Sequence, residues 1–373
     1  MTVPATVDPA TVDPATVDPA AEQPVVVATQ PGPERSVVPR SLTDGHLYQI
    51  DLFRMLTFVA VIFVHATGGT TSVSSLTANG TLNLLHFTRE AFFFLTAFVL
   101  FHTYYRRPPM ATTFWRRRFL LVGVPYVAWS VFYGFGQVRQ VAHDDGLLDA
   151  AGRLGWLLIT GDAYYHLYFL LVTLQVYLFF PLILKLVRRT EGHHGLLLAA
   201  SVVLQAAILL EVQYGPPRPG LWGVARTHAH VLLLTYQLWV VIGALAAVHL
   251  RGFHARVGDR PGRALAVTAG GAAVATLSYA EAIRAGQNPF TASGVFQPIM
   301  ILWAPAMIVG LYAVGSMWAR RRRPGGRVDA FVMLASEISF GVYLVHPAVL
   351  NWVLRVLPGL AAPVSTVVTV MVT

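Results

Sequence analysis

The residues best placed to do chemistry lie in one apolar segment, 51–65, which reads DLFRMLTFVAVIFVH. Arg54 and His65 are eleven positions apart, and at about 100° per residue this spacing brings both side chains to nearly the same face of a helix. The helical rise separates them by roughly 16 Å along the axis, so we expect the guanidinium near one membrane boundary and the imidazole well toward the other.

Ionisable groups inside a membrane-spanning helix usually face the bundle interior or a water-filled cavity, where they mark a pathway or a site. An imidazole in such a place can take the proton of a hydroxyl group as that group attacks an electrophile. The alternative is that Arg54 extends to the lipid headgroups and that His65 is a packing residue. Because the two side chains share one face, we favour the functional interpretation.

The composition indicates an integral membrane protein. Of the 373 residues, 55% are hydrophobic and 12% are charged, which is too apolar for a soluble chain of this length. The sequence contains no cysteine, which excludes disulfides, thiol nucleophiles and zinc–thiolate sites. The formal net charge of +9 does not indicate a nucleic-acid partner here, because the arginines flank apolar segments and serve orientation and contact with the lipid bilayer.

The chain divides into two parts. In residues 1–45 the pentapeptide ATVDP begins at Ala5, Ala10 and Ala15, and a Pro-rich tract follows. Such a composition cannot bury a core, so we predict a disordered cytoplasmic tail without a catalytic role. Residues 46–373 form the predicted membrane domain.

This second part contains apolar segments of membrane-spanning length in series. We therefore predict an all-α, polytopic bundle of about ten transmembrane helices. The last segment has only about eleven residues after Pro363, less than a full crossing, so we expect it to be tilted, shallow or truncated. The ten segments are 47–67, 84–105, 118–138, 165–187, 195–213, 228–250, 264–283, 296–318, 330–352 and 360–373.

The loops between these segments predict the orientation. Even-numbered loops carry 17 Lys and Arg residues and odd-numbered loops carry six. Because these cations accumulate in cytoplasmic loops, both termini are predicted to face the cytoplasm, in a multi-pass protein of the cell membrane. The run 320–323 in the eighth loop is assigned to topology alone.

In this orientation the histidines of the membrane segments gather in the outer half. His65 lies near the outer end of the first helix, His166 opens the fourth, and the ninth runs outward through Tyr343 to His346. The second helix begins outside with His86, Arg89 and Glu90. For the remaining candidates, a place at the membrane interface is the simpler explanation: His102, His228 and His230.

Five segments in the right order resemble acyltransferase family 3, integral-membrane enzymes that O-acylate glycans, lipids and secondary metabolites. The first is the DLFR tetrad with the arginine, ten residues, histidine spacing of Arg54 and His65. The others are FTREAFFFLTAFVLF at 87–101, FWRRRFLLVGVPY at 114–126, HLYFLLVTLQVYL at 166–178 and ISFGVYLVHPAVL at 338–350.

The likeness covers residues 50–350 and is closest to the branch that acetylates or succinylates bacterial surface polysaccharides. There are departures from the family pattern. Ala91 to Phe94 stand where the family has Pro-Leu-Phe-Phe, and Thr96-Ala97 where it has Ser-Gly. We therefore expect less backbone bending in the second helix.

The resemblance implies transfer of an acyl group from acyl-coenzyme A to a hydroxyl, with no tightly bound cofactor and no metal. We expect His65 to be the general base. The donor would enter from the cytoplasm, where its phosphates need cations, and Arg116, Arg117 and Arg118 are available there with Arg54 further in. The acceptor, a glycan, a lipid-linked sugar or a small metabolite, would arrive from the outer half, and both acetyl and succinyl remain open.

Two interpretations of Arg89 stay open. It could bind the acceptor or stabilise the oxyanion, or it could simply pair with Glu90. Glu90, His166, Tyr343 and His346 are the weaker candidates, as residues that line the substrate pocket.

Other mechanisms find no support in the sequence. The fifth residue after His65 is Thr70 and after His346 it is Asn351, so a His-x-x-x-x-Asp motif is absent, as is a Gly-x-Ser-x-Gly elbow. The adjacent His193 and His194 do not make a metal site.

The alternative function is a transporter or flippase for a glycan or lipid without covalent chemistry. Such proteins often have two similar halves with broken helices at matched positions, and the sequence shows neither. A third possibility, a membrane anchor without activity, would tolerate leucine at Arg54 and His65.

Overall fold

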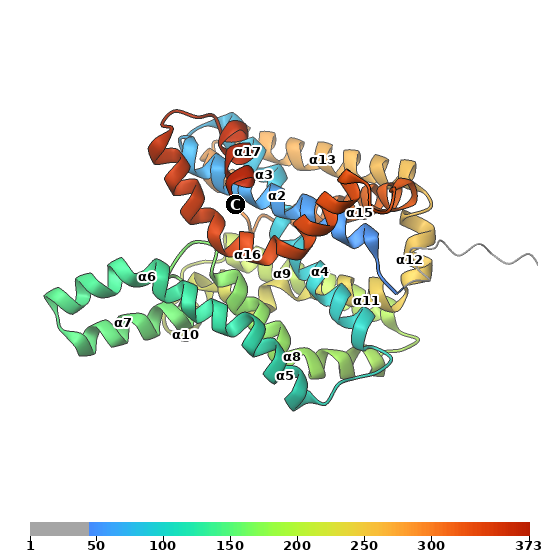
Figure 1. Ribbon diagram of the computed structural model, residues 1–373, viewed down its shortest axis with the longest axis horizontal. Coiled ribbons are helices and arrows are strands. Elements are labelled where there is room, and N and C mark those ends of the chain that lie inside the picture. The colour runs from blue at the N-terminus through green and yellow to red at the C-terminus, as the bar shows by residue number, and fades with distance from the viewer. Residues whose placement is uncertain (1–44) are drawn as a thin grey trace, which may run out of the picture. The chain divides into compact units, whose positions relative to one another are not determined.

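The computed structural model describes residues 45–373, and within them every regular element is a helix (Figure 1). The predicted all-α class is therefore confirmed for this part of the chain. The predicted tail lies almost entirely outside the described residues.

Seven helical segments of the described part are long and apolar enough to cross a membrane, or eight if one bent pair is counted. The bent pair is α11 (Gln237–Val248), extended at its start by a 3-10 turn, and α12 (Leu250–Val257), which meet at 97°. The seven are α2 (Tyr48–Thr70), α3 with α4 (Leu76–Leu85 and Phe87–Tyr104), α5 with α6 (Ala111–Arg118 and Val124–Asp144, joined by a π-helical turn), α8 (Tyr168–Arg189), α9 (His194–Tyr214), α15 (Met300–Arg321) and α16 (Arg327–Val356).

The other two predicted segments are also helices. α13 (Pro261–Arg284) has 24 residues, enough to cross, but its many Ala, Gly and Thr residues make it less apolar than the seven. α17 (Ala362–Val372) has 11 residues, which is shorter than a crossing. The structure thus supports seven or eight spans, and the count of about ten stays a prediction.

One helix lies where the sequence predicted only a loop. α6 continues to Asp144, six residues beyond the predicted end, and α7 (Leu147–Thr160) returns along it, so that the two helices lie side by side (Figure 1). Gly146 makes the turn with a φ of 102°, a conformation that side chains other than glycine rarely adopt. The short remaining connections of the chain are α10 (Gly220–Thr227) and α14 (Pro289–Ala292).

The first membrane helix, α2, lies at the centre of the packing. It contacts α3, α4, α15, α16 and α17, and its Phe53 and Ile62 are completely buried. Small residues let neighbouring backbones approach closely, as is usual between membrane helices. At Gly243 of α11, for example, a Cβ atom would lie 2.3 Å from the backbone oxygen of Phe94 in α4.

Contacts between loops bring the basic segments to one end of the bundle. The Arg188 guanidinium at the end of α8 donates to the backbone oxygen of Tyr105 at the end of α4. Arg322, which follows α15, lies over the ring of Tyr48 at the start of α2, 3.3 Å from its centroid. These contacts agree with the alternation of helix directions inferred from the distribution of Lys and Arg.

The close approach of α4 and α11 predicts the effect of a single methyl group. Gly243→Ala should lower the midpoint of thermal unfolding in detergent, because relieving the clash with the Phe94 carbonyl costs about 1–3 kcal/mol. Gly341→Ala in α16 is the matched control, since nothing lies within 4 Å of its Cβ position. Equal midpoints for the two variants would contradict the predicted contact.

Candidate active site

Three imidazoles from separate parts of the chain meet at one place. His65 of α2 and His346 of α16 have ring centroids 5.3 Å apart, and His166, just before α8, lies 5.5 Å from His346. The Tyr165 ring also packs against His65, with the ring centroids 4.4 Å apart. The structure therefore joins the strongest predicted site residue, His65, to two of the weaker ones.

Proline fixes the orientation of the His346 ring. Pro347 has no N–H, so the carbonyl oxygen of Tyr343, four residues earlier, lacks its usual helical donor. His346 Nδ1 lies 2.7 Å from that oxygen. Because a carbonyl oxygen only accepts, Nδ1 carries the proton and Nε2 is left with a free lone pair.

Tyr343, another weaker candidate, ties α16 to His166. Its hydroxyl donates to the backbone oxygen of His166 over 2.5 Å. The His166 side chain itself is 1% exposed, and neither of its ring nitrogens has a hydrogen-bond partner among residues 45–373. His346 Nε2 is unpartnered in the same sense. Buried polar atoms are nearly always paired, so these nitrogens indicate a place where a ligand or water binds.

A cavity of about 140 Å³ lies beside the imidazoles, and we call it the His65 cavity. His65, His166 and Tyr343 line it together with His86, Thr88, Arg89 and Phe92. Tyr165 also lines it and is 45% exposed, so the cavity approaches the surface beside that ring. Its lining combines aromatic surface with a few polar groups, as is typical of small-molecule sites.

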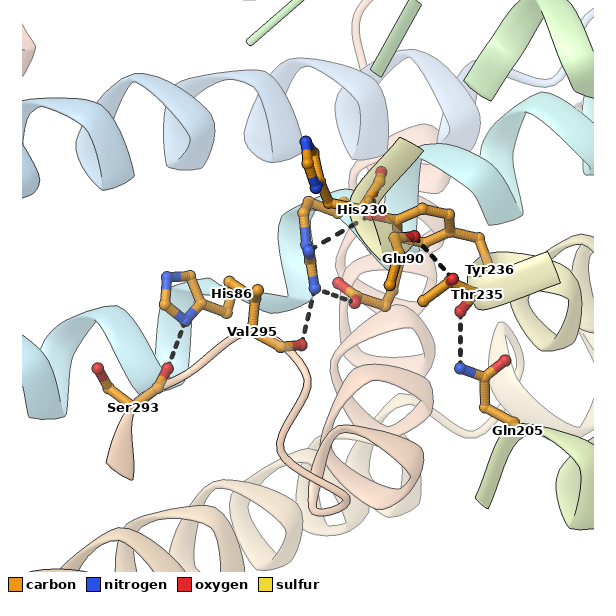
Figure 2. Close-up of polar contacts among 10 residues, drawn as sticks. His86, Glu90, Gln205, His230, Thr235, Tyr236, Ser293 and Val295 are labelled. Atoms are coloured by element: carbon orange, nitrogen blue, oxygen red, sulfur yellow. Dashed lines mark hydrogen bonds and ion pairs between the residues drawn. The ribbon is translucent and has the colours of Figure 1, made fainter. Parts of the chain in front are cut away.

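Arg89 lines this cavity. Two of the residues that hold it, Glu90 and Val295, are labelled in Figure 2. Its Nη2 donates to Glu90 Oε1 at 3.0 Å and to the backbone oxygen of Val295 at 2.8 Å. Its guanidinium also lies 5.6 Å from the ring centroid of Tyr236. The pairing of Arg89 with Glu90 is thus present, while Nε has no partner in the described residues. Glu90, which is 2% exposed, does not line the His65 cavity.

His86, which directly precedes α4, lines the His65 cavity together with Arg89 and is also held in place. Its Nδ1 lies 2.8 Å from the backbone oxygen of Ser293 and must donate to it (Figure 2). The ring therefore lines the cavity in one defined tautomer.

Arg54 belongs to a second cavity, of about 180 Å³, which we call the Arg54 cavity. Arg54 donates from Nη1 to Ser336 Oγ at 3.1 Å, and that hydroxyl donates to Asp51 at 2.9 Å. Arg118 faces the same cavity, with its guanidinium 5.5 Å from the ring centroid of Tyr177. Two cations of the predicted site thus line one cavity.

The other two predicted donor-binding cations lie elsewhere. Arg116 and Arg117 are exposed and do not line the Arg54 cavity. Three consecutive residues of a helix point in different directions, about 100° apart, so only one of the three can face a given cavity.

A third, basic cavity of about 350 Å³ lies between the α4–α5 connection and the end of α8. Phe114, Lys185 and Arg189 are among its lining residues. This cavity lies near the Arg54 cavity, because the Arg118 guanidinium lies 5.8 Å from the Phe114 ring centroid. From the sequence, Lys185 and Arg189 counted only among the 17 cations of the even-numbered loops.

The sequence also did not single out the aromatic residues of the site. Tyr165, Tyr168 and Phe169 line the His65 cavity, and Tyr177 the Arg54 cavity. All of them belong to the stretch from Tyr165 into α8, in which His166 was the one candidate residue named from the sequence. An aromatic residue in an apolar segment is read as packing surface unless the fold shows a cavity beside it.

Among the described residues, no group of three or more His, Asp or Glu side chains is placed to hold a metal ion.

The chain matches one known protein family. The model of the acyltransferase 3 family, described as an acyltransferase domain, matches residues 47–373. Comparisons with curated proteins and with solved structures gave no match. The family match includes all the residues of the two cavities, on a bundle of apolar helices. The chain is a membrane acyltransferase and belongs to the acyltransferase 3 family.

Proposed function

We propose that the protein is an O-acyltransferase of the cell membrane that moves an acetyl- or succinyl-class group from acyl-coenzyme A, at the cytoplasmic side, to a hydroxyl at the other side. The acceptor is a glycan, a lipid-linked sugar or a small metabolite, and His65 is the general base. The observation that carries the proposal is that α2 presents Arg54 to one cavity and His65 to the next.

The proposed chemistry uses the unpaired nitrogens of the site. An acceptor hydroxyl enters beside the exposed Tyr165 ring, and the His65 imidazole takes its proton as the oxygen attacks the thioester carbonyl. The tetrahedral intermediate then collapses, the carbon–sulfur bond breaks, and the imidazolium returns the proton to the thiolate of coenzyme A. His346, whose ring packs 5.3 Å from that of His65, holds the His65 ring in position.

Arg89 is proposed to stabilise the negative oxygen of the intermediate. Its Nη2 is occupied by Glu90 and Val295, but its Nε–H has no partner among the described residues. A hydrogen-bond donor that is already in position beside the developing charge accelerates acyl transfer, because the site need not reorganise during the reaction. Pairing with Glu90 and oxyanion stabilisation are therefore compatible roles.

The donor is proposed to lie along the three cavities. Its phosphorylated nucleotide would contact Lys185 and Arg189 in the basic cavity, and its arm would pass Arg118 and Arg54 to bring the thioester to His65. Guanidinium and ammonium groups suit phosphate oxygens, and the apolar cavity walls suit the arm.

The proposal predicts that His65→Ala abolishes acyl transfer. Loss of a general base costs about 10²- to 10⁴-fold in rate. The assay incubates the purified full-length protein with labelled acetyl- or succinyl-coenzyme A and a glycan and lipid extract from cells that lack the protein. His143→Ala, which changes an exposed histidine at the end of α6, is the control and should keep full activity.

Two results would refute this role. Unchanged label transfer in His65→Ala would remove His65 from the chemistry. Movement of an extract component across a vesicle membrane without any label in it would instead support a transporter. Mass spectrometry of the labelled product names both the acyl group and the acceptor.

The placement of the donor predicts unequal effects of two neighbouring arginines. Arg118→Gln should raise KM for acetyl-coenzyme A about 10- to 100-fold with little change in kcat, because a hydrogen bond to a charged group is lost. Arg116→Gln changes an exposed residue of the same helix and should leave KM unchanged. If the two variants behave alike in steady-state kinetics, the donor does not pass through the Arg54 cavity.

A further inference from the structure

One side chain lines both cavities. Phe92 of α4 is among the residues around the His65 cavity and among those around the Arg54 cavity. It is the one residue that the two linings have in common. The Phe92 ring therefore lies at the boundary between the Arg54 cavity and the His65 cavity.

The boundary position follows from helix geometry. Thr88, Phe92 and Thr96 are spaced by four and share one face of α4. Thr88 lines the His65 cavity, Thr96 lines the Arg54 cavity, and Phe92 lies between them. Within the stretch from Ala91 to Phe101, only Phe92, Thr96 and Val99 are not buried, and all three line one or both of the cavities.

The neighbouring helices α2 and α8 also contribute side chains to both cavities. α2 gives His65 to one cavity and Arg54 to the other, and α8 gives Phe169 to one and Tyr177 to the other. The Phe92 ring packs edge-on against Phe169 at 5.4 Å and against Tyr343 at 6.3 Å. The ring thus projects from α4 toward both α8 and α16 at the level where the cavities meet.

We infer that Phe92 sets the length of the acyl group that the enzyme accepts, and that it restricts the donor to short acyl groups. This inference rests on the proposed function. A thioester brought to His65 from the Arg54 cavity has its sulfur beside Phe92 and its acyl group in the His65 cavity. That cavity, of about 140 Å³, must also admit the acceptor hydroxyl. A longer chain would need the space that the ring fills.

The inference can be tested without knowing the acceptor. S-ethyl-, S-butyl- and S-hexyl-coenzyme A are thioethers that lack the carbonyl, so they bind in place of the donor but cannot react. Each is titrated against the purified full-length protein in detergent, and its dissociation constant is obtained from the rise in the unfolding midpoint, since a ligand of the folded state stabilises it by mass action.

The wild-type protein should bind the ethyl analogue better than the hexyl analogue. Phe92→Ala should raise the preference for hexyl over ethyl by at least about tenfold, because each methylene buried is worth about fourfold in affinity. Phe92→Leu keeps a large apolar side chain, so its ratio of hexyl to ethyl affinity should lie between those of the wild type and Phe92→Ala. This variant replaces Phe92→Ala in the test if the alanine variant does not fold. Val99→Ala enlarges the Arg54 cavity alone and should leave the ratio unchanged.

Each outcome separates this inference from the proposed function. Suppose that the ethyl analogue binds but that the ratio of the hexyl and ethyl dissociation constants is the same in the wild type and both Phe92 variants. Phe92 then does not set acyl length, and the proposed function stands. If Val99→Ala changes the ratio as much as Phe92→Ala does, the selectivity does not come from the boundary between the cavities. If no analogue binds to the wild type, the proposed donor and the inference both fall.

Discussion

The structure depends on one constraint: a hydrocarbon environment does not solvate charge, so each ionisable side chain inside the bundle needs a partner or a cavity. Arg89 meets it with Glu90 and the Val295 carbonyl, and Arg54 meets it with Ser336 and an open cavity. The imidazoles are different, because His166 and His346 keep nitrogens without partners among the described residues. These nitrogens belong to the imidazole cluster where the proposed chemistry takes place.

The same constraint explains why the site is rigid on one side and open on the other. Pro347 frees the Tyr343 carbonyl, which then fixes His346, and the Tyr343 hydroxyl reaches the His166 backbone. These contacts join α16 to the start of α8 and hold the imidazoles together. On α4, the half-buried Phe92 and Thr96 line the cavities beside these contacts. Fixed imidazoles beside a cavity suit the proposed enzyme.

The sequence predicted much of this arrangement, and the limits of that prediction have physical causes. The spacing of Arg54 and His65 fixed their common helix face, and the structure places a cavity at each. The likeness to acyltransferase family 3 was confirmed by the family match over residues 47–373. Periodicity alone did not show which of Arg116, Arg117 and Arg118 faces inward, because that depends on the neighbouring helix. Nor did periodicity show that Phe92 lies at the boundary between the two cavities, since residues distant in sequence form such a boundary. The helix α7 was missed because it is short and follows a turn that only the φ of Gly146 reveals.

In the proposed function, the acyl group crosses the membrane through the protein while coenzyme A stays on the donor side. Its most direct measurement uses sealed vesicles that contain the protein, with acyl-labelled acetyl-coenzyme A on the side of the basic loops and an extract of cell-surface glycans and lipids on the other. The account predicts label in the extract on the far side and free coenzyme A only on the donor side. The protein contains no cysteine, so a thiol reagent reports coenzyme A without a background from the protein. Label that enters only acceptors placed on the donor side would contradict the account.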